Sequence, residues 1–209
     1  MKGSLLVVGF FFLGCLLGWF GWLPAFIREN DLSVYVLYLL MFQVGLSIGS
    51  DKQLKQILRN IRPRLLCVPL ATIVGTLSFT ALASLLLSRW GVFDCLAVGS
   101  GFAYYSLSSI LITQLKEPSL GAQVAAELGT IALMTNIIRE LFALLGAPLF
   151  MRYFGRLAPI CAGGATTMDT TLPIITRYCG NEWVFVSLFH GFLVDFSVPF
   201  LVTFFCSFG

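Results

Sequence analysis

Long apolar runs are the feature that most limits what this chain can fold into. A helix needs roughly 20 apolar residues to cross a bilayer, and four segments reach that length: residues 5–23, 65–88, 129–150 and 184–205. A fifth segment, residues 32–48, is shorter, mostly apolar and without a charged residue. The runs predict an all-α integral membrane protein with about five transmembrane helices and the lipid bilayer as its solvent.

The composition excludes several other classes of protein. Only 11% of the 209 residues are charged, whereas soluble domains average about 25%. Twenty phenylalanines argue against a disordered chain, and a net charge of +3 without a basic face argues against a nucleic-acid partner. The six cysteines are scattered without metal-ligand spacing. No P-loop occurs, and we expect no enzyme, catalytic residue, metal or cofactor.

Two further stretches, residues 95–115 and 159–176, are long enough to cross the membrane but rich in Gly, Ser, Thr and Tyr. Irregular backbone is tolerated at membrane depth only where protein or a water-filled cavity surrounds it. Interrupted segments of this kind point to the binding site of a transporter. We therefore expect broken or re-entrant helices; the alternative is two ordinary spans packed through small residues.

The basic residues favour the five-span arrangement. The loop after residue 48 carries Lys52, Lys55, Arg59, Arg62 and Arg64, which the positive-inside rule places in the cytoplasm. With both interrupted stretches re-entrant, nine basic residues lie inside and three, Lys116 among them, lie outside. This arrangement predicts a cytoplasmic N-terminus and a C-terminus outside, in a multi-pass protein of the inner membrane.

Two charges fall at the middle of the predicted span 129–150. Ionisable residues in the hydrocarbon region are costly and are candidates for function. Arg139 and Glu140 point about 100° apart on a helix and cannot simply pair, and Asn136 lies one turn before Glu140 on the same face. The alternative to a binding role is an ion pair between helices that fixes their packing.

The interrupted stretches supply further candidates. Asp169 lies in the second stretch among hydroxyls and before Pro173, where irregular backbone and acceptors could coordinate a cation; the alternative is a helix cap. If the two interrupted stretches enter the bilayer from opposite sides, their tips would meet near its midplane, at the depth of Glu140. The hydroxyl-bearing candidates are Tyr104, Tyr105, Ser106, Ser108, Thr166, Thr167 and Thr170.

Two carboxylates in a hydroxyl-lined cavity favour a cationic or zwitterionic substrate over an anion. Arg139 is a candidate for pairing with one of them or with a substrate carboxylate. His190 and Asp195 in the last span are candidates for a proton relay; the alternative for this histidine is a hydrogen-bonded packing role.

Several motifs resemble the lysine exporter family LysO. They are Met41-Phe-Gln-Val-Gly-Leu46, the string from Ser100 to Thr113, Asn136 with Arg139-Glu140-Leu141, the string from Cys161 to Pro173, and His190-Gly-Phe. The likeness covers almost the whole chain, with the motifs in family order. It implies secondary export of L-lysine and basic analogues, with Glu140 and Asp169 on the family's intramembrane acidic positions. Asp195 departs from the family, which more often has an uncharged residue there.

The resemblance also implies three further spans before the point where this chain begins. We therefore expect the chain to be the larger piece of a split, inverted-repeat exporter. A small three-span partner subunit, or a homodimer, would supply the rest. The main hypothesis is a lysine carrier, with proton antiport as its coupling. The alternatives are a non-transporting scaffold subunit and a cation-conducting channel.

Overall fold

The computed structural model describes most of the chain after residue 62. The described residues are 13, 16–20, 35, 39, 42 and 63–208. The predicted spans 5–23 and 32–48, apart from those few positions, and the basic loop up to residue 62 lie outside the described residues. The chain divides into two compact units, Met1–Phe42 and Gln43–Gly209. All that follows concerns the second unit.

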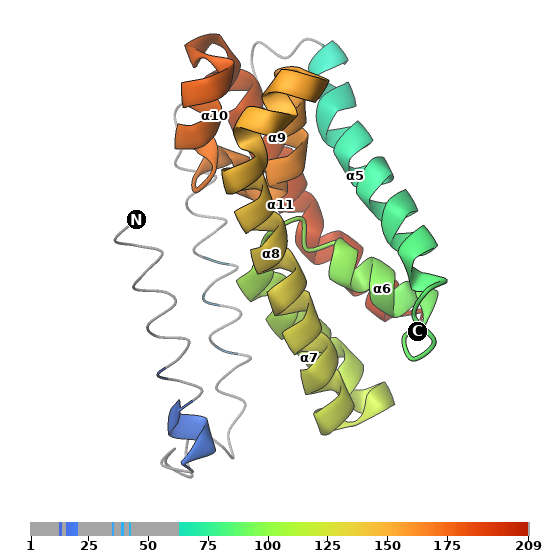
Figure 1. Ribbon diagram of the computed structural model, residues 1–209. Helices are drawn as coiled ribbons and strands as arrows, with labels where there is room; N and C mark the ends of the chain where they lie inside the picture. Colours follow the sequence, from blue (N-terminus) through green and yellow to red (C-terminus); the bar gives the residue numbers. More distant parts are fainter. Residues whose placement is uncertain are drawn as a thin grey trace. The chain divides into compact units, whose positions relative to one another are not determined.

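The described part of the second unit consists of helices joined by short connections, and this part contains no strand. In chain order the helices, labelled in Figure 1, are α5 (Pro63–Ser84), α6 (Val92–Gly99), α7 (Tyr105–Leu120), α8 (Ala122–Phe154), α9 (Leu157–Gly163), the 3₁₀ helix η1 (Gly164–Met168), α10 (Leu172–Cys179), the 3₁₀ helix η2 (Asn181–Trp183) and α11 (Val184–Cys206).

Three helices of the described part are long and apolar enough to cross a membrane: Leu65–Ser84, Ala122–Phe154 and Asn181–Cys206. They correspond to three of the predicted spans. The first ends at Ser84, earlier than predicted. The second is much longer than the predicted 129–150: 33 residues at 1.5 Å each give about 50 Å, which exceeds the hydrocarbon thickness of about 30 Å.

Each interrupted stretch folds into a helical hairpin. In the first hairpin (residues 92–120), Lys116 near the end of α7 forms an ion pair of 2.6 Å with Asp94 in the first turn of α6. In the second hairpin (residues 157–179), the thiol of Cys179 at the end of α10 contacts the carbonyl of Arg156, just before α9, at 3.4 Å. The two ends of each stretch therefore lie close together, and its irregular backbone forms the tip of the hairpin.

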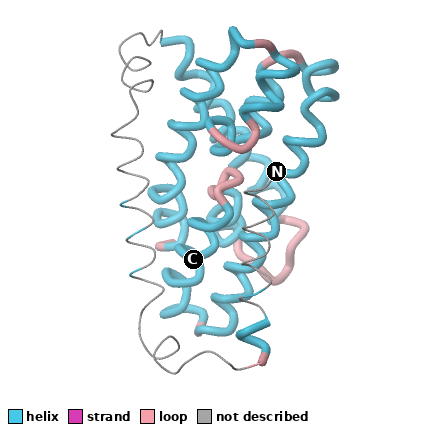
Figure 2. Tube along the Cα trace, turned by 90° about the vertical axis from the view of Figure 1, so that its left-hand side faces the viewer, coloured by secondary structure: helices cyan, strands magenta, loops and turns pink. Residues whose placement is uncertain are grey.

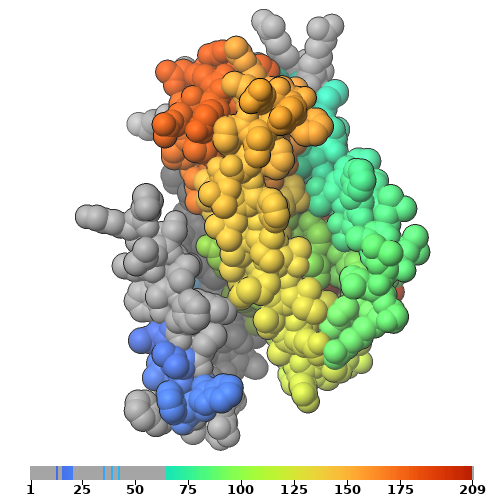
Figure 3. Space-filling view, viewed as in Figure 1, coloured from blue at the N-terminus to red at the C-terminus, as the bar shows by residue number. Residues whose placement is uncertain are grey.

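The two hairpins extend from opposite ends of α8. Gly121 joins the first hairpin to the start of α8, and Gly155 follows its end; both have φ near +80°, which favours glycine. Between them α8 runs from α9 and α10 at one end to α7 at the other (Figures 1 and 3). In Figure 2, loop segments lie within this helical unit as well as at its ends.

Large apolar side chains on the long helices are exposed in this unit. Examples are Phe79 on α5, Leu145 on α8 and Phe200 on α11. The buried core consists mainly of small and branched residues such as Ala132 and Val194. Small side chains between helices and large ones outside are typical of packing in a bilayer. The protein is a helical, membrane-embedded protein.

Candidate functional site

The tips of the two hairpins touch each other through their backbones. The amide of Ala165, in η1, donates a hydrogen bond of 2.9 Å to the carbonyl of Phe102. Gly164 has φ +60°, and a Cβ at this position would collide with the same carbonyl. A glycine is therefore required here both by its backbone conformation and by the close approach of the other tip.

Asn136, at the middle of α8, holds the first tip. Phe102 and Ala103 have φ of 43° and 75°, a region that residues with side chains rarely adopt. The amide of Ala103 donates a 2.8 Å hydrogen bond to Oδ1 of Asn136, and Nδ2 of Asn136 donates to the carbonyls of Val98 (3.3 Å) and Ala132 (2.9 Å). One buried amide side chain thus satisfies the Ala103 amide, which the break in the helix leaves without a backbone partner, and links it to α6 and α8.

Arg139, one turn later on α8, holds the second hairpin. Its guanidinium donates to the carbonyls of Ala162 (3.2 Å) and Cys161 (3.3 Å), in the last turn of α9, and to the hydroxyl of Thr76 on α5 (3.3 Å). It also lies 5.5 Å from the ring centre of Phe102. A cation at the C-terminal end of a helix is favourably placed against the helix dipole.

His190, on α11, is fully buried and bridges α5 to the second tip. Its Nε2 lies 2.9 Å from the hydroxyl of Thr72, and its Nδ1 lies 3.1 Å from the hydroxyl of Thr167 in η1. Ser187, one turn earlier on α11, donates a 2.8 Å hydrogen bond to the carbonyl of Thr167. Hydrogen bonds from His190 and Ser187 to Thr167 therefore link the last long helix to the second tip.

Three carboxylates gather around the meeting tips. Glu140 on α8 interacts with the hydroxyl of Thr170 and with the charge of Asp169, and Asp169 in turn acts on Asp195 of α11. Asp169 is exposed, Glu140 is half-buried, and Asp195 is 4% exposed. Exposure of the three carboxylates therefore decreases from Asp169 through Glu140 to Asp195.

Two tyrosines of the first tip interact electrostatically with these carboxylates. Tyr104 is within electrostatic range of Asp195 and Asp169, and Tyr105 is within range of Glu140 and Asp169. The amide of Thr170 donates to the carboxylate of Asp169. Phenol and threonine hydroxyls supply donors and acceptors next to negative charge, which suits a ligand that carries ammonium groups.

The three carboxylates have no basic partner in the described part of the chain. The ion pairs found there are Arg89–Glu127, Lys116–Asp94 and Arg156–Glu182. The same residues include no group of three His, Cys, Asp or Glu side chains that could hold one metal ion. Unpaired carboxylates spread over several positions are suited to an organic cation with separated charges.

Comparison with known proteins identifies the family. A family model described as lysine exporter LysO matches residues 8–206. This chain belongs to the LysO family. The family is one of exporters and not of enzymes.

Two curated relatives support the assignment to the LysO family. "Lysine exporter LysO" of Escherichia coli (strain K12) is 32% identical over 206 residues, which cover 97% of this chain and 64% of that protein. "Putative lysine exporter" of Haemophilus influenzae is 31% identical over 201 residues, covering 94% of each chain. The chain thus spans about 64% of the length of the first relative. No solved structure matches it.

The candidate site residues predicted from the sequence form two groups in the structure. Those around the carboxylates are Glu140, Asp169, Asp195, Tyr104, Tyr105 and Thr170. Those bonded to backbone or to neighbouring side chains that fix the hairpins are Asn136, Arg139, Ser108, Thr166, Thr167 and His190. Ser106 is half-buried on α7.

The sequence reasoning missed three contributors. Thr72 and Thr76 on α5 contact His190 and Arg139, but a threonine in an apolar run carries no distinctive signal. Asp94 was also missed, and Lys116, which the sequence analysis counted only as a basic residue on the outer side, is buried against Asp94 at 0% exposure. An opposite charge at each end of one interrupted stretch was the available signal for this pair.

Proposed function

We propose that this chain exports L-lysine, with the ammonium groups of the substrate bound by Glu140, Asp169 and Asp195. The observation that carries the proposal is the group of three carboxylates without a basic partner in residues 63–208, at the point where the hairpin tips meet. Membership of a family named for lysine export supports the choice of substrate. Lysine carries two ammonium groups, so more than one carboxylate is useful.

We further propose that both hairpins are re-entrant and enter the bilayer from opposite sides. Their bases lie at opposite ends of α8, a helix long enough to span the membrane, while Asn136 and Arg139 hold their tips at its middle. Broken helices that meet near the midplane are a common plan for binding sites in transporters with inverted repeats. Such an arrangement keeps irregular backbone away from lipid.

Within this site the two groups of residues have different roles. Tyr104, Tyr105 and Thr170 line the path of the substrate beside the carboxylates. Asn136, Arg139 and Thr167 position the backbone of the tips. Proton antiport would use the same carboxylates in alternation, with Asp195 and His190 as the relay. Basic analogues of lysine would share the site because they carry the same charge.

The remaining proposals concern the membrane, the orientation and the partner of the protein. We propose the bacterial inner membrane, with the N-terminus in the cytoplasm and the C-terminus outside, from the distribution of basic residues. We also propose a partner, either a small three-span subunit or a second copy of the chain. Cross-linking in native membranes, followed by mass spectrometry of the product, tests both forms of that proposal.

Proteoliposomes loaded with labelled lysine test the function. Glu140→Gln and Asp169→Asn should abolish saturable flux while the protein remains folded. Glu182→Gln is the matched control, because that carboxylate is exposed and paired with Arg156. Flux that does not saturate would indicate a channel, and an unaffected flux in both variants would reject the site. Repeating the assay with a pH gradient tests proton coupling.

A further inference from the structure

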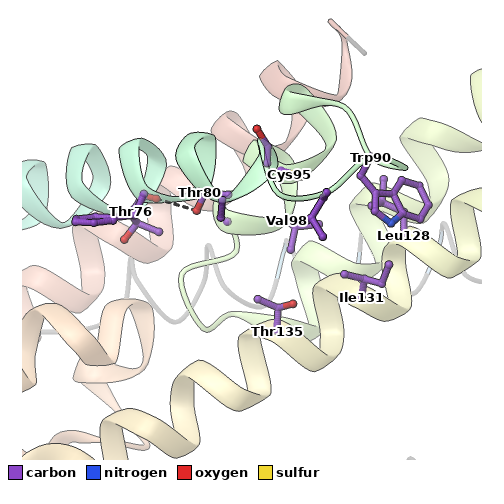
Figure 4. A pocket seen from close by; sticks show the side chains of 13 residues that line it. Thr76, Thr80, Trp90, Cys95, Val98, Leu128, Ile131 and Thr135 are labelled. Carbon is purple, nitrogen blue, oxygen red and sulfur yellow. Dashed lines mark hydrogen bonds between the residues drawn. The ribbon is translucent and has the colours of Figure 1, made fainter.

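A cavity of about 380 Å³ lies between α5, α6 and α8, and none of the three carboxylates lines it. Ligand sites commonly have volumes of about 300–1,000 Å³. Figure 4 shows its lining, which extends from Thr76 at one end to Trp90 and Leu128 at the other. None of the residues that line it is charged.

The hydroxyl groups in this lining offer little to a polar ligand. Thr80 donates to the carbonyl of Thr76 (2.8 Å), and Ser84 donates to the carbonyl of Ala81 (2.7 Å). The hydroxyl oxygen of Thr76 accepts a bond from Arg139. Those bonds occupy most of the polar groups of the lining, to which Thr135 adds one further hydroxyl, and the other lining residues are largely apolar. A lysine molecule here would lose its hydration without a charged partner.

An ion pair marks the end of the cavity at Trp90 and Leu128. Arg89 and Glu127, their immediate chain neighbours, are joined at 2.6 Å, with side chains 63% and 41% exposed. The Arg89 guanidinium also lies 5.2 Å from the Trp90 ring centre. A positive and a negative group therefore stand side by side at one end of an apolar cavity. Tryptophan and arginine are characteristic of the membrane–water interface.

We propose that this cavity binds one acyl chain of a zwitterionic phospholipid such as phosphatidylethanolamine. The acyl chain lies along the uncharged lining between Trp90 and Thr76. The phosphate of the head group faces Arg89, and its ammonium group faces Glu127. Both charges of the pair then have a partner of opposite sign, which an anionic lipid without an ammonium group does not provide.

Native mass spectrometry of the detergent-purified protein tests the acyl-chain site. Ala83→Phe fills the cavity, because Ala83 is part of its lining on α5. Ala71→Phe is the matched control, since this exposed alanine of the same helix is not part of the lining. Wild type and Ala71→Phe should retain one phospholipid, and Ala83→Phe should retain at least tenfold less. Absence of lipid from wild type, or equal retention by both variants, would overturn the proposal.

A second pair of variants protects the test against misfolding. Ala83→Leu and Ala71→Leu make the same comparison with a smaller side chain, and circular dichroism checks that both are helical. The head group is tested with equal amounts of phosphatidylethanolamine and phosphatidylglycerol. Wild type should prefer the former several-fold, and Arg89→Gln combined with Glu127→Gln should lose this preference. An unchanged preference would overturn the head-group assignment. None of these measurements depends on lysine export.

Discussion

The amide of Ala165 donates a 2.9 Å hydrogen bond to the carbonyl of Phe102, and this bond joins the tips of two hairpins that extend from opposite ends of α8. Both partners are backbone groups, so the contact depends on the shape of the chain and not on side-chain chemistry. That shape requires positive φ at Phe102, Ala103 and Gly164. Such conformations cost of order 1–3 kcal/mol each where a side chain is present. The surrounding contacts must offset this cost.

Gly164→Ala should weaken the contact between the tips. The added Cβ meets the carbonyl of Phe102 and also sits at φ +60°. We expect a loss of about 1–3 kcal/mol from the strained backbone alone, and more from the collision. Thermal unfolding in detergent, followed by circular dichroism, measures the change.

Gly121→Ala separates the cost of the strained backbone from the cost of the collision. Gly121 has φ +80°, but a Cβ there meets nothing within 4 Å. Gly121→Ala should therefore show only the cost of the strained backbone. Gly164→Ala should be clearly less stable than Gly121→Ala, and it should lose lysine flux. Equal destabilisation of the two variants would mean that the contact between the tips is unimportant.

Asn136→Ala should destabilise the protein by about 1–3 kcal/mol, because it leaves the buried amide of Ala103 without its acceptor. Thr130→Ala, also on α8, is the control: its exposed hydroxyl bonds only to the carbonyl of Ala126, so its loss should change stability little. Denaturant unfolding in detergent compares the two. A difference below the experimental error would show that Asn136 does not hold the first tip.

Hydropathy predicted the long helices of the described part because a bilayer requires about 20 apolar residues. The richness in Gly, Ser and Thr likewise predicted where the helices break. Placing Glu140 at the middle of a span identified one member of the carboxylate group from solvation cost alone. Each of these predictions depends only on the local sequence of a single helix or stretch.

The sequence did not reveal which polar residues bind backbone and which face the site. Asn136 and Glu140 lie one turn apart on α8 and are equally unusual in a membrane. Only the position of the first tip shows that Asn136 is bonded to Ala103 while Glu140 lies beside Thr170. Such partners come from distant parts of the chain, and no spacing rule within one helix specifies them.

Lys116→Met should be strongly destabilising. It removes the cation of a buried pair and leaves Asp94 unpaired where the first hairpin closes; breaking such pairs costs about 3–5 kcal/mol. Asp94→Leu combined with Lys116→Met should recover much of that loss, because no buried charge remains. A double variant that is as unstable as the sum of the single changes would contradict a direct pairing.

Arg139→Lys should reduce lysine flux about tenfold, although the charge is kept. A lysine ammonium lacks the planar fork with which Arg139 reaches the carbonyls of Cys161 and Ala162 and the hydroxyl of Thr76, and bonds from charged groups contribute about 1.5–3 kcal/mol. Flux of 1,5-diaminopentane decides between two roles for this residue. That compound has the two amines of lysine but no carboxylate. If Arg139 positions the second hairpin, the substitution should reduce both fluxes by the same factor; a loss confined to lysine would instead assign Arg139 to the substrate carboxylate.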